Sequence, residues 1–201
     1  MKLATHQLFV TEAHASFTMT DYFRNAAHDQ WTQARRRAVI TRLTANLRGR
    51  EARLIDYDEI AQRLSLRSAR YIGCLPILLE KIVGSVGRYQ DFTAAFLPVT
   101  REMQSRWENV ALLFLDPARF PPPIEAYKVG ENYFVRDGNH RVSVARQLKL
   151  ADVEAHVWEY PLPVKGLPPS ADIDTLLIAY ERQDFLETTH LDTLRPGMPF
   201  I

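Results

Sequence analysis

The stretch from Ile124 to Trp158 constrains the fold more than any other part of the sequence. Residues 124–129 alternate between apolar and polar side chains, and residues 133–136 read as a returning strand after a short polar connection, which predicts a β-hairpin. Asp137-Gly138-Asn139 then breaks the strand, apolar positions at helical spacing predict a helix over 140–150, and residues 153–158 predict a further strand. This succession indicates a small mixed sheet with helices, that is, an α+β (mixed α/β) fold.

Helical periodicity dominates the sequence before this stretch. Asp21 and Thr20 are good N-caps for a helix whose apolar stripe continues to Leu47, with Gly49 as its stop. A second helix is expected to open at Asp56, and residues 76–83 read as one short, partly buried strand. Further helices are predicted over 100–115 and 173–185. These elements divide the chain into an N-terminal helical module (1–70), the α+β domain (71–160), and a C-terminal helix and tail (161–201).

The turn at Asp137-Gly138-Asn139-His140-Arg141 carries the chemistry that stands out. The first backbone N–H groups of a helix have no partner inside it, and they point outward with the positive end of the helix dipole. Gly138 lets a ligand approach the backbone closely, so the turn predicts an anion site. Arg141 and a protonated His140 oppose the dipole at this position, and a bound phosphate would relieve that conflict. The alternative is structural, with Asp137 capping the helix and His140 hydrogen-bonded inside the protein.

A family resemblance favours the functional interpretation. The stretch from Val135 to Leu148, with its Gly138-Asn139-His140-Arg141 turn, resembles the second conserved segment of ParB-type domains and is similar to the Gly-Cys-His-Arg turn of sulfiredoxin. Ile77-x-Leu79-x-x-Ile82 resembles the opening strand of that family, and Pro123-Ile124 resembles the approach to its hairpin. The chain is therefore identified as a member of the ParB/sulfiredoxin-like (ParB-like nuclease domain) family, with a family core at about residues 71–160.

The resemblance implies a nucleotide, CTP or ATP with Mg²⁺, held at Gly138, Asn139, His140 and Arg141. It also implies further nucleotide contacts from the loop after the first strand, for which Ser85 and Arg88 are the candidates. Asn139 stands where sulfiredoxin has its nucleophilic cysteine, so sulfiredoxin activity is not expected. Asn139, His140 and Ser143 also depart from the ParB pattern, which leaves the choice of nucleotide and its hydrolysis open.

Three functional hypotheses follow. The first is a nucleotide-binding regulatory domain in which ligand binding shifts the flanking helices. The second is a phosphoryl-transfer enzyme, such as an NTPase or a small-molecule kinase, with Glu80 or Asp137 as candidate catalytic carboxylates. The third is a DNA-binding or nuclease protein.

The third hypothesis depends on the arginine-rich segment 35–53. Residues 21–53 contain eight arginines, no lysine and three acidic residues, and Arg35, Arg36 and Arg37 are consecutive. Such a cluster attracts nucleic-acid phosphates. The favoured alternative is a solvated helix that docks on acidic parts of its own chain or of a twin, because no aromatic residue interleaves with the arginines of this segment. A homodimer therefore stays open.

Composition limits the remaining possibilities. No apolar run is long enough for a transmembrane helix, and the first ten residues do not resemble a signal peptide. Cys74 is the only cysteine, which excludes an intrachain disulfide and fits a reducing, cytoplasmic environment. The six histidines are scattered without metal-ligand spacing, so no protein-bound metal is expected. The three tryptophans, Trp31, Trp107 and Trp158, are predicted to lie in the core.

Overall fold

A computed structural model describes residues 18–47, 53–162, 164 and 171–194. The predicted residues at the N-terminus, at Gly49 and in the C-terminal tail after residue 194 lie outside these ranges. The helices are α1 (Met19–Leu47), α2 (Tyr57–Arg63), α3 (Gln104–Leu115), α4 (Asn139–Gln147), α5 (Ile173–Thr189), α6 (Leu191–Leu194) and the 3₁₀ turn η1 (Leu79–Lys81). The strands are β1 (Ile55–Asp56), β2 (Arg70–Leu78), β3 (Ile82–Ser85), β4 (Ile124–Val129), β5 (Asn132–Asp137) and β6 (Asp152–Tyr160).

The strands form one six-stranded mixed sheet in the order β1-β3-β5-β4-β6-β2, which confirms the predicted α+β fold. Strands β1, β3 and β5 run parallel to one another, and β4 runs parallel to β6. The pairs β4–β5 and β2–β6 are antiparallel. Because the carboxyl ends of β1, β3 and β5 lie at the same edge, Ser85 and Asp137 finish neighbouring strands there.

The hairpin, the glycine turn and the following helix occur in the predicted order. Strands β4 and β5 are joined by Gly130 and Glu131, and Gly130 has a φ of 62°. Helix α4 begins one residue earlier than expected, at Asn139, and ends at Gln147 rather than Leu150. Lys149 adopts a φ of 60°, and this left-handed residue ends the helical path.

The predicted single strand over residues 76–83 is wrong. Strand β2 ends at Leu78, the 3₁₀ turn η1 follows, and β3 begins at Ile82 in a different part of the sheet. Arg146 of α4 donates to the carbonyl oxygens of Leu79 and Ile82, at 2.6 Å each, and thereby holds the turn between the two strands. Because this contact is distant in sequence, the local pattern of apolar residues does not indicate the break between β2 and β3.

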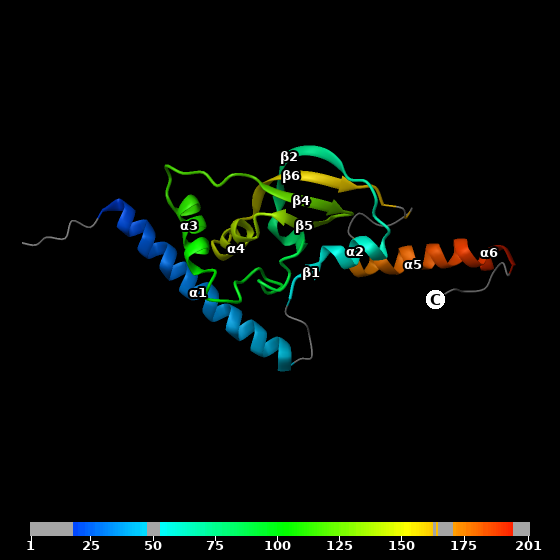
Figure 1. Ribbon diagram of the computed structural model, residues 1–201, viewed down its shortest axis with the longest axis horizontal. Coiled ribbons are helices and arrows are strands. Elements are labelled where there is room, and N and C mark those ends of the chain that lie inside the picture. The colour runs from blue at the N-terminus through cyan, green and yellow to red at the C-terminus, as the bar shows by residue number, and fades with distance from the viewer. Residues whose placement is uncertain (1–17, 48–52, 163, 165–170, 195–201) are drawn as a thin grey trace, which may run out of the picture.

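Helices α4, α3 and α1 are stacked, in that order, on one face of the sheet (Figure 1). Val142 and Ala145 of α4 pack on the sheet, and Val144 faces a second cluster formed with α3 and α1. In that cluster the rings of Trp31 and Trp107 lie 5.7 Å apart. Both are buried as predicted, whereas Trp158 is only half-buried on β6.

Helices α2 and α5 cover part of the other face (Figure 1). Tyr57 of α2 packs against Tyr127 and Phe134 of the sheet, with ring centroids 4.8 and 5.6 Å apart. Arg63 of α2 forms an ion pair with Glu181 of α5 at 2.5 Å. Strand β1 and helix α2, within the predicted N-terminal module, thus contribute to the same sheet and core as later residues. The predicted boundary at residue 70 stays a prediction.

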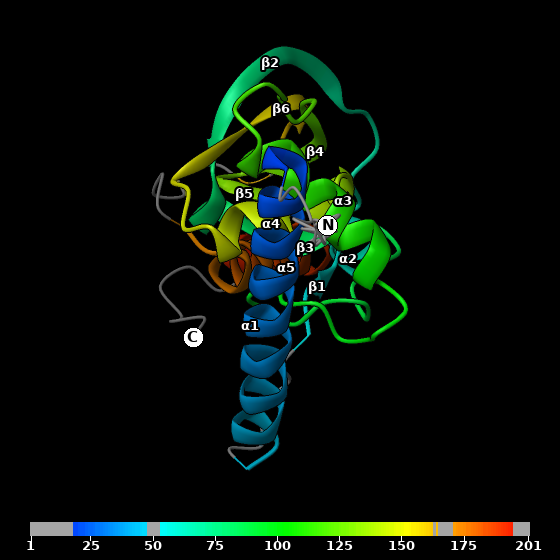
Figure 2. The same ribbon diagram turned by 90° about the vertical axis from the view of Figure 1, so that its left-hand side faces the viewer.

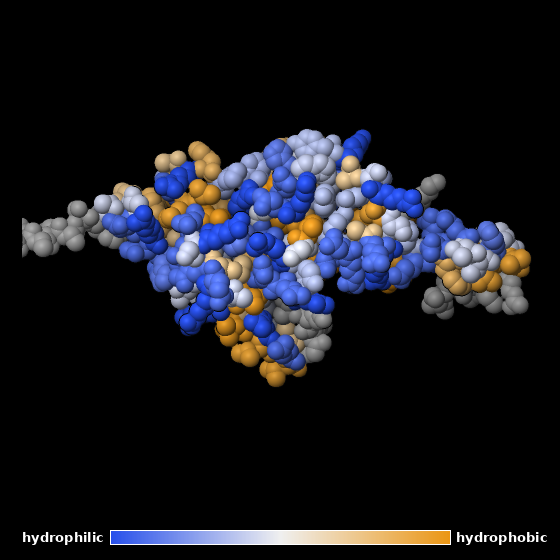
Figure 3. Space-filling model, in the orientation of Figure 1, coloured by the Kyte–Doolittle hydropathy of each residue, from blue (hydrophilic) through white to orange (hydrophobic). Residues whose placement is uncertain are grey.

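Helix α1 extends past the body of the molecule (Figure 2). Its buried residues, Ala27, Trp31, Ala34 and Ala38, occupy one side of its first two-thirds. Val39, Ile40, Leu43 and Leu47 are exposed in the last third, where Figure 3 shows apolar surface at the projecting end. Across the described ranges, no helix combines the length and apolarity needed to cross a bilayer.

Candidate functional site

The turn between β5 and α4 has a backbone that only glycine suits. Gly138 is the N-cap of α4 and has a φ of 107°, a region that L side chains rarely adopt. A Cβ at this position would lie 2.6 Å from Cγ2 of Ile124. No side chain caps the helix, and its first hydrogen bond runs from the Val142 amide to the Gly138 carbonyl at 3.0 Å. The amides of residues 139–141 therefore precede the helical hydrogen-bond ladder and are available to an anion.

Two buried polar side chains in the first turn of α4 have atoms without partners. Asn139 is 5% exposed and His140 is 6% exposed. Oδ1 of Asn139 and Nε2 of His140 are fully buried and make no hydrogen bond with any residue that the structure describes. Leaving such a group unsatisfied costs about 1–3 kcal/mol, so unpaired atoms of this kind call for an explanation, such as a ligand or an ordered water.

The charges of two arginines act on His140. Burial first, and then the positive charges of Arg106 and Arg88, together lower the pKa of His140 from 6.5 to about 4, while the charge of Asp91 acts in the opposite direction. At neutral pH the imidazole is therefore uncharged. Arg106 is exposed in the first turn of α3 and makes no hydrogen bond or ion pair with the described residues. The first turn of α4 thus faces positive charge from two separate segments.

Ser85 and Arg88 lie on the segment that follows β3. Ser85 is fully buried, and its hydroxyl donates to the carbonyl oxygen of Val135 at 3.3 Å. Its hydroxyl therefore holds β3 against β5 next to the glycine turn. Arg88 is half-exposed and pairs with Asp91 at 3.4 Å. The structure brings Arg88, but not the Ser85 hydroxyl, to the site in a form that a ligand can reach.

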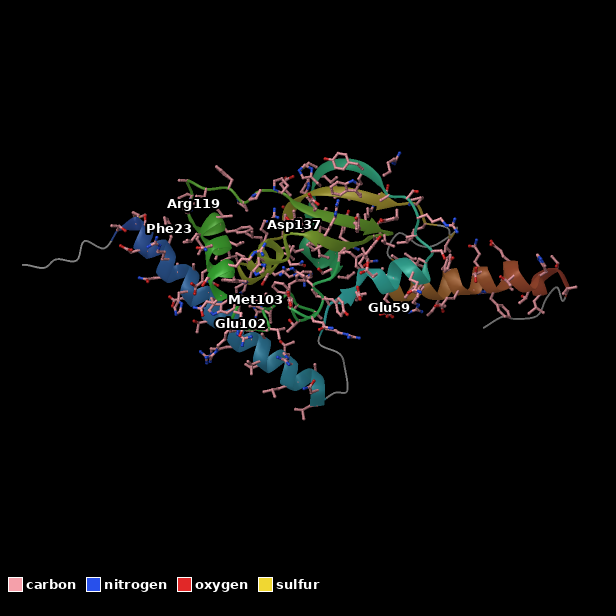
Figure 4. All side chains as sticks on the ribbon, in the orientation of Figure 1. Phe23, Glu59, Glu102, Met103, Arg119 and Asp137 are labelled. Carbon is pink, nitrogen blue, oxygen red and sulfur yellow. The ribbon has the colours of Figure 1, made fainter. Side chains whose placement is uncertain are left out.

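Arg141 is already bonded to its own chain. Its guanidinium donates to the carbonyl oxygens of Pro122, at 2.9 Å, and of Pro123. It also forms an ion pair with Asp137 at 2.6 Å, and its side chain is only 14% exposed. Arg141 therefore joins the turn to the segment before β4. Figure 4 shows Asp137 where β5 ends, beside α4.

The two candidate catalytic carboxylates lie apart. Asp137 is at the turn but is engaged by Arg141. Glu80 is exposed in η1, which Arg146 binds from the last turn of α4. His140 and Arg146 are six residues apart, about 9 Å along a helix, so Glu80 lies towards the opposite end of α4 from the candidate anion site.

The three consecutive arginines of α1 do not share one surface. Arg35 donates to the carbonyl oxygens of Pro98, at 2.9 Å, and Val99. Arg37 donates to Oε1 of Gln147 at 3.0 Å, and Arg36 is exposed. Successive helical residues are separated by about 100°, which spreads these side chains around the helix. Two of the three arginines thus dock α1 on its own chain.

Sequence reasoning missed Arg106 and Asp91. Arg106 carried a usable signal, because it is a cation in the first turn of a predicted helix and opposes the helix dipole, as Arg141 does. Helix α3 has no acidic residue in that turn to offset it. Asp91 lies in an irregular loop, where no periodicity marks it. Its role becomes visible only through its contact with Arg88.

Other hollows lie elsewhere on the described part of the molecule, and one of about 390 Å³ is lined by Arg35, Arg36 and Arg101. A hollow of about 790 Å³ runs along α5 between residues that include Ile178, Ala179 and Leu186, and contains none of the predicted site residues. A pocket of about 210 Å³ lies beside Arg141 and Pro122. Among the residues placed by the structure, no group of three or more His, Cys, Asp or Glu side chains could hold a metal ion.

Comparison with known proteins identifies no relative: no family model, curated protein or solved structure matches the chain.

Proposed function

We propose that this protein binds a phosphate-bearing ligand of the nucleotide class at the start of α4. The observation that carries the proposal is the start of α4 at Gly138, where no described side chain caps the first amides and the buried Nε2 of His140 has no partner. A phosphate at this position would accept hydrogen bonds from the first amides of α4. The positive charges of Arg88 and Arg106, which both act on His140, would attract the phosphate.

Each residue has a distinct part in this proposal. Gly138 keeps the backbone open to the ligand, and Arg88 and Arg106 supply positive charge from the loop after β3 and from α3. Arg141 holds the turn in place by its bonds to Asp137 and the segment before β4. Magnesium would arrive with the nucleotide, as the counterion of its phosphates.

We place a binding and regulatory role ahead of phosphoryl transfer. A general base must lie within hydrogen-bond reach of the proton that it removes. Asp137 is engaged by Arg141, and Glu80 lies towards the far end of α4. The proposed kinship with ParB-type and sulfiredoxin domains is supported by the order of hairpin, glycine turn and helix, and by the bonding of α4 to the first strands. The preferred nucleotide is left to experiment.

The test is a thermal-shift panel of CTP, ATP, ADP and GTP, each with Mg²⁺, and of inorganic phosphate. A ligand at one hundred times its dissociation constant stabilises the folded state by about 2.7 kcal/mol. We expect at least one nucleotide to raise the melting temperature, and we expect the double variant Arg88→Ala/Arg106→Ala to lose the response. Arg182→Ala, an exposed arginine of α5, is the matched control and should respond as the wild type does.

Two outcomes would refute the proposal. One is a wild-type protein that responds to none of these ligands. The other is a double variant that folds and retains the full response, because it would place the ligand elsewhere. Turnover is followed separately by release of nucleoside diphosphate or free phosphate, and steady release would shift the assignment to an enzyme.

A further inference from the structure

We propose that Asp91 is a built-in competitor for the phosphate site, whose carboxylate occupies Arg88 until a ligand replaces it. This inference rests on the proposed function and concerns its regulation. It assigns to the loop after β3 the control of how much ligand is needed to fill the site.

The backbone fixes Asp91 beside Arg88. The Asp91 amide donates to the Arg88 carbonyl at 3.2 Å, and the Asp91 carbonyl accepts from the Val99 amide at 3.0 Å. Both bonds belong to a tight loop, so the Asp91 backbone is fixed beside that of Arg88. Oδ2 of Asp91 lies 3.4 Å from Nη1 of Arg88.

This ion pair is suited to exchange. Both side chains are about half-exposed, and pairs of this kind contribute little to stability. Breaking the pair to admit a ligand therefore costs little. The arginine exchanges one carboxylate for a phosphate, which can carry more charge and offers more acceptor oxygens.

The same loop lies directly on the first turn of α4. Phe92, the next residue, is 1% exposed, and its ring meets the His140 ring edge-on with centroids 5.4 Å apart. This contact keeps Asp91 close to the helix start, and its charge acts on His140 in the direction opposite to that of Arg88. An anion bound at α4 would therefore meet a fixed negative charge at its border.

Two effects of Asp91 act against the ligand. The carboxylate reduces the positive charge that Arg88 offers, and it repels the incoming anion directly. Both effects disappear when the carboxylate becomes a neutral amide of nearly the same shape. Both also weaken as salt screens the charges, because the groups are exposed.

The experiment measures the affinity for inorganic phosphate by isothermal titration calorimetry at low ionic strength. For Asp91→Asn we expect a dissociation constant about three- to tenfold lower than that of the wild type, from Coulomb repulsion between nearby charges in a solvent-like dielectric. Asp91→Ser is a second variant that also lacks the charge, and circular dichroism checks that both fold. The gain should shrink when sodium chloride is added.

The matched control is Asp116→Asn. Asp116 forms an ion pair of the same spacing with Arg119, at 3.0 Å. This pair follows the end of α3, whereas Arg106 lies in its first turn, and Figure 4 shows Arg119 and Met103 at opposite ends of the helix. Asp116→Asn should therefore leave the affinity for phosphate unchanged.

The outcomes separate this inference from the function on which it rests. If Arg88→Ala weakens phosphate binding but neither Asp91 variant tightens it, the competitor role is wrong and the site stands. If neither the wild type nor any Asp91 variant binds phosphate or a nucleotide, the site itself is wrong. Equal tightening in Asp116→Asn would reduce the effect to net charge and would also overturn the inference.

Discussion

Acidification should destabilise this protein through His140. The imidazole is buried at the start of α4, and its folded-state pKa of about 4 lies below the ordinary value of 6.5. Between these two values the unfolded chain binds a proton that the folded chain does not. Stability is therefore complete above pH 6.5 and decreases as the pH falls towards 4. The difference between the two pKa values corresponds to about 2 kcal/mol at pH 5, and to about 3 kcal/mol once both states are protonated.

The assay is urea unfolding at pH 7 and pH 5, followed by circular dichroism, for the wild type and for His140→Gln. Glutamine keeps a hydrogen-bonding group but does not titrate, so other acid-sensitive groups cancel in the comparison. The wild type should lose about 2 kcal/mol more than the variant between the two pH values. Equal losses in the two proteins would refute this account of His140.

Ligand binding gives the same prediction a second readout. A phosphate beside the imidazole would stabilise its protonated form and raise the pKa of His140. Saturating phosphate should therefore reduce the extra acid sensitivity of the wild type relative to His140→Gln. A difference that phosphate leaves unchanged would place the anion away from this residue.

Two further predictions concern the frame that holds the site. Gly138→Ala should lower the free energy of unfolding by about 2–4 kcal/mol, because it adds a strained φ and a contact with Ile124; a loss below 1 kcal/mol in urea unfolding would contradict the geometry of the turn. Arg146→Met should cost about 2–4 kcal/mol, because it leaves two backbone carbonyls around η1 without their charged donor; unchanged stability would show that the β2–β3 turn does not depend on this arginine.

Local patterns were sufficient to predict the hairpin and the helix that follows it. The alternation of β4, the short β-prone run of β5, the glycine at 138 and the apolar spacing of α4 all lie close together in the sequence. The position of an open helix start could be predicted for the same reason. The burial of Trp31 and Trp107 also followed from helical spacing, since each lies on the apolar stripe of its own helix.

Features that depend on distant contacts could not be predicted. The break between β2 and β3 is fixed by Arg146, more than sixty residues later in the chain. Arg141 is an apparent phosphate ligand in sequence, but the carbonyl groups of Pro122 and Pro123 take up its donors. The charge of Arg106 acts on His140 because α3 packs on α4, and a single sequence does not specify that packing.

The indole of Trp107 donates its N–H to the hydroxyl of Ser143 at 2.8 Å, and Ser143 is three residues after His140. The Trp107 ring also contacts Trp31. A small displacement of α4 would alter the polarity around this chromophore and its coupling to a second one. Trp107 is thus an intrinsic fluorescent reporter that is hydrogen-bonded to α4, the helix that begins at the candidate site. We therefore expect the emission spectrum of the unlabelled protein to change when the proposed ligand binds.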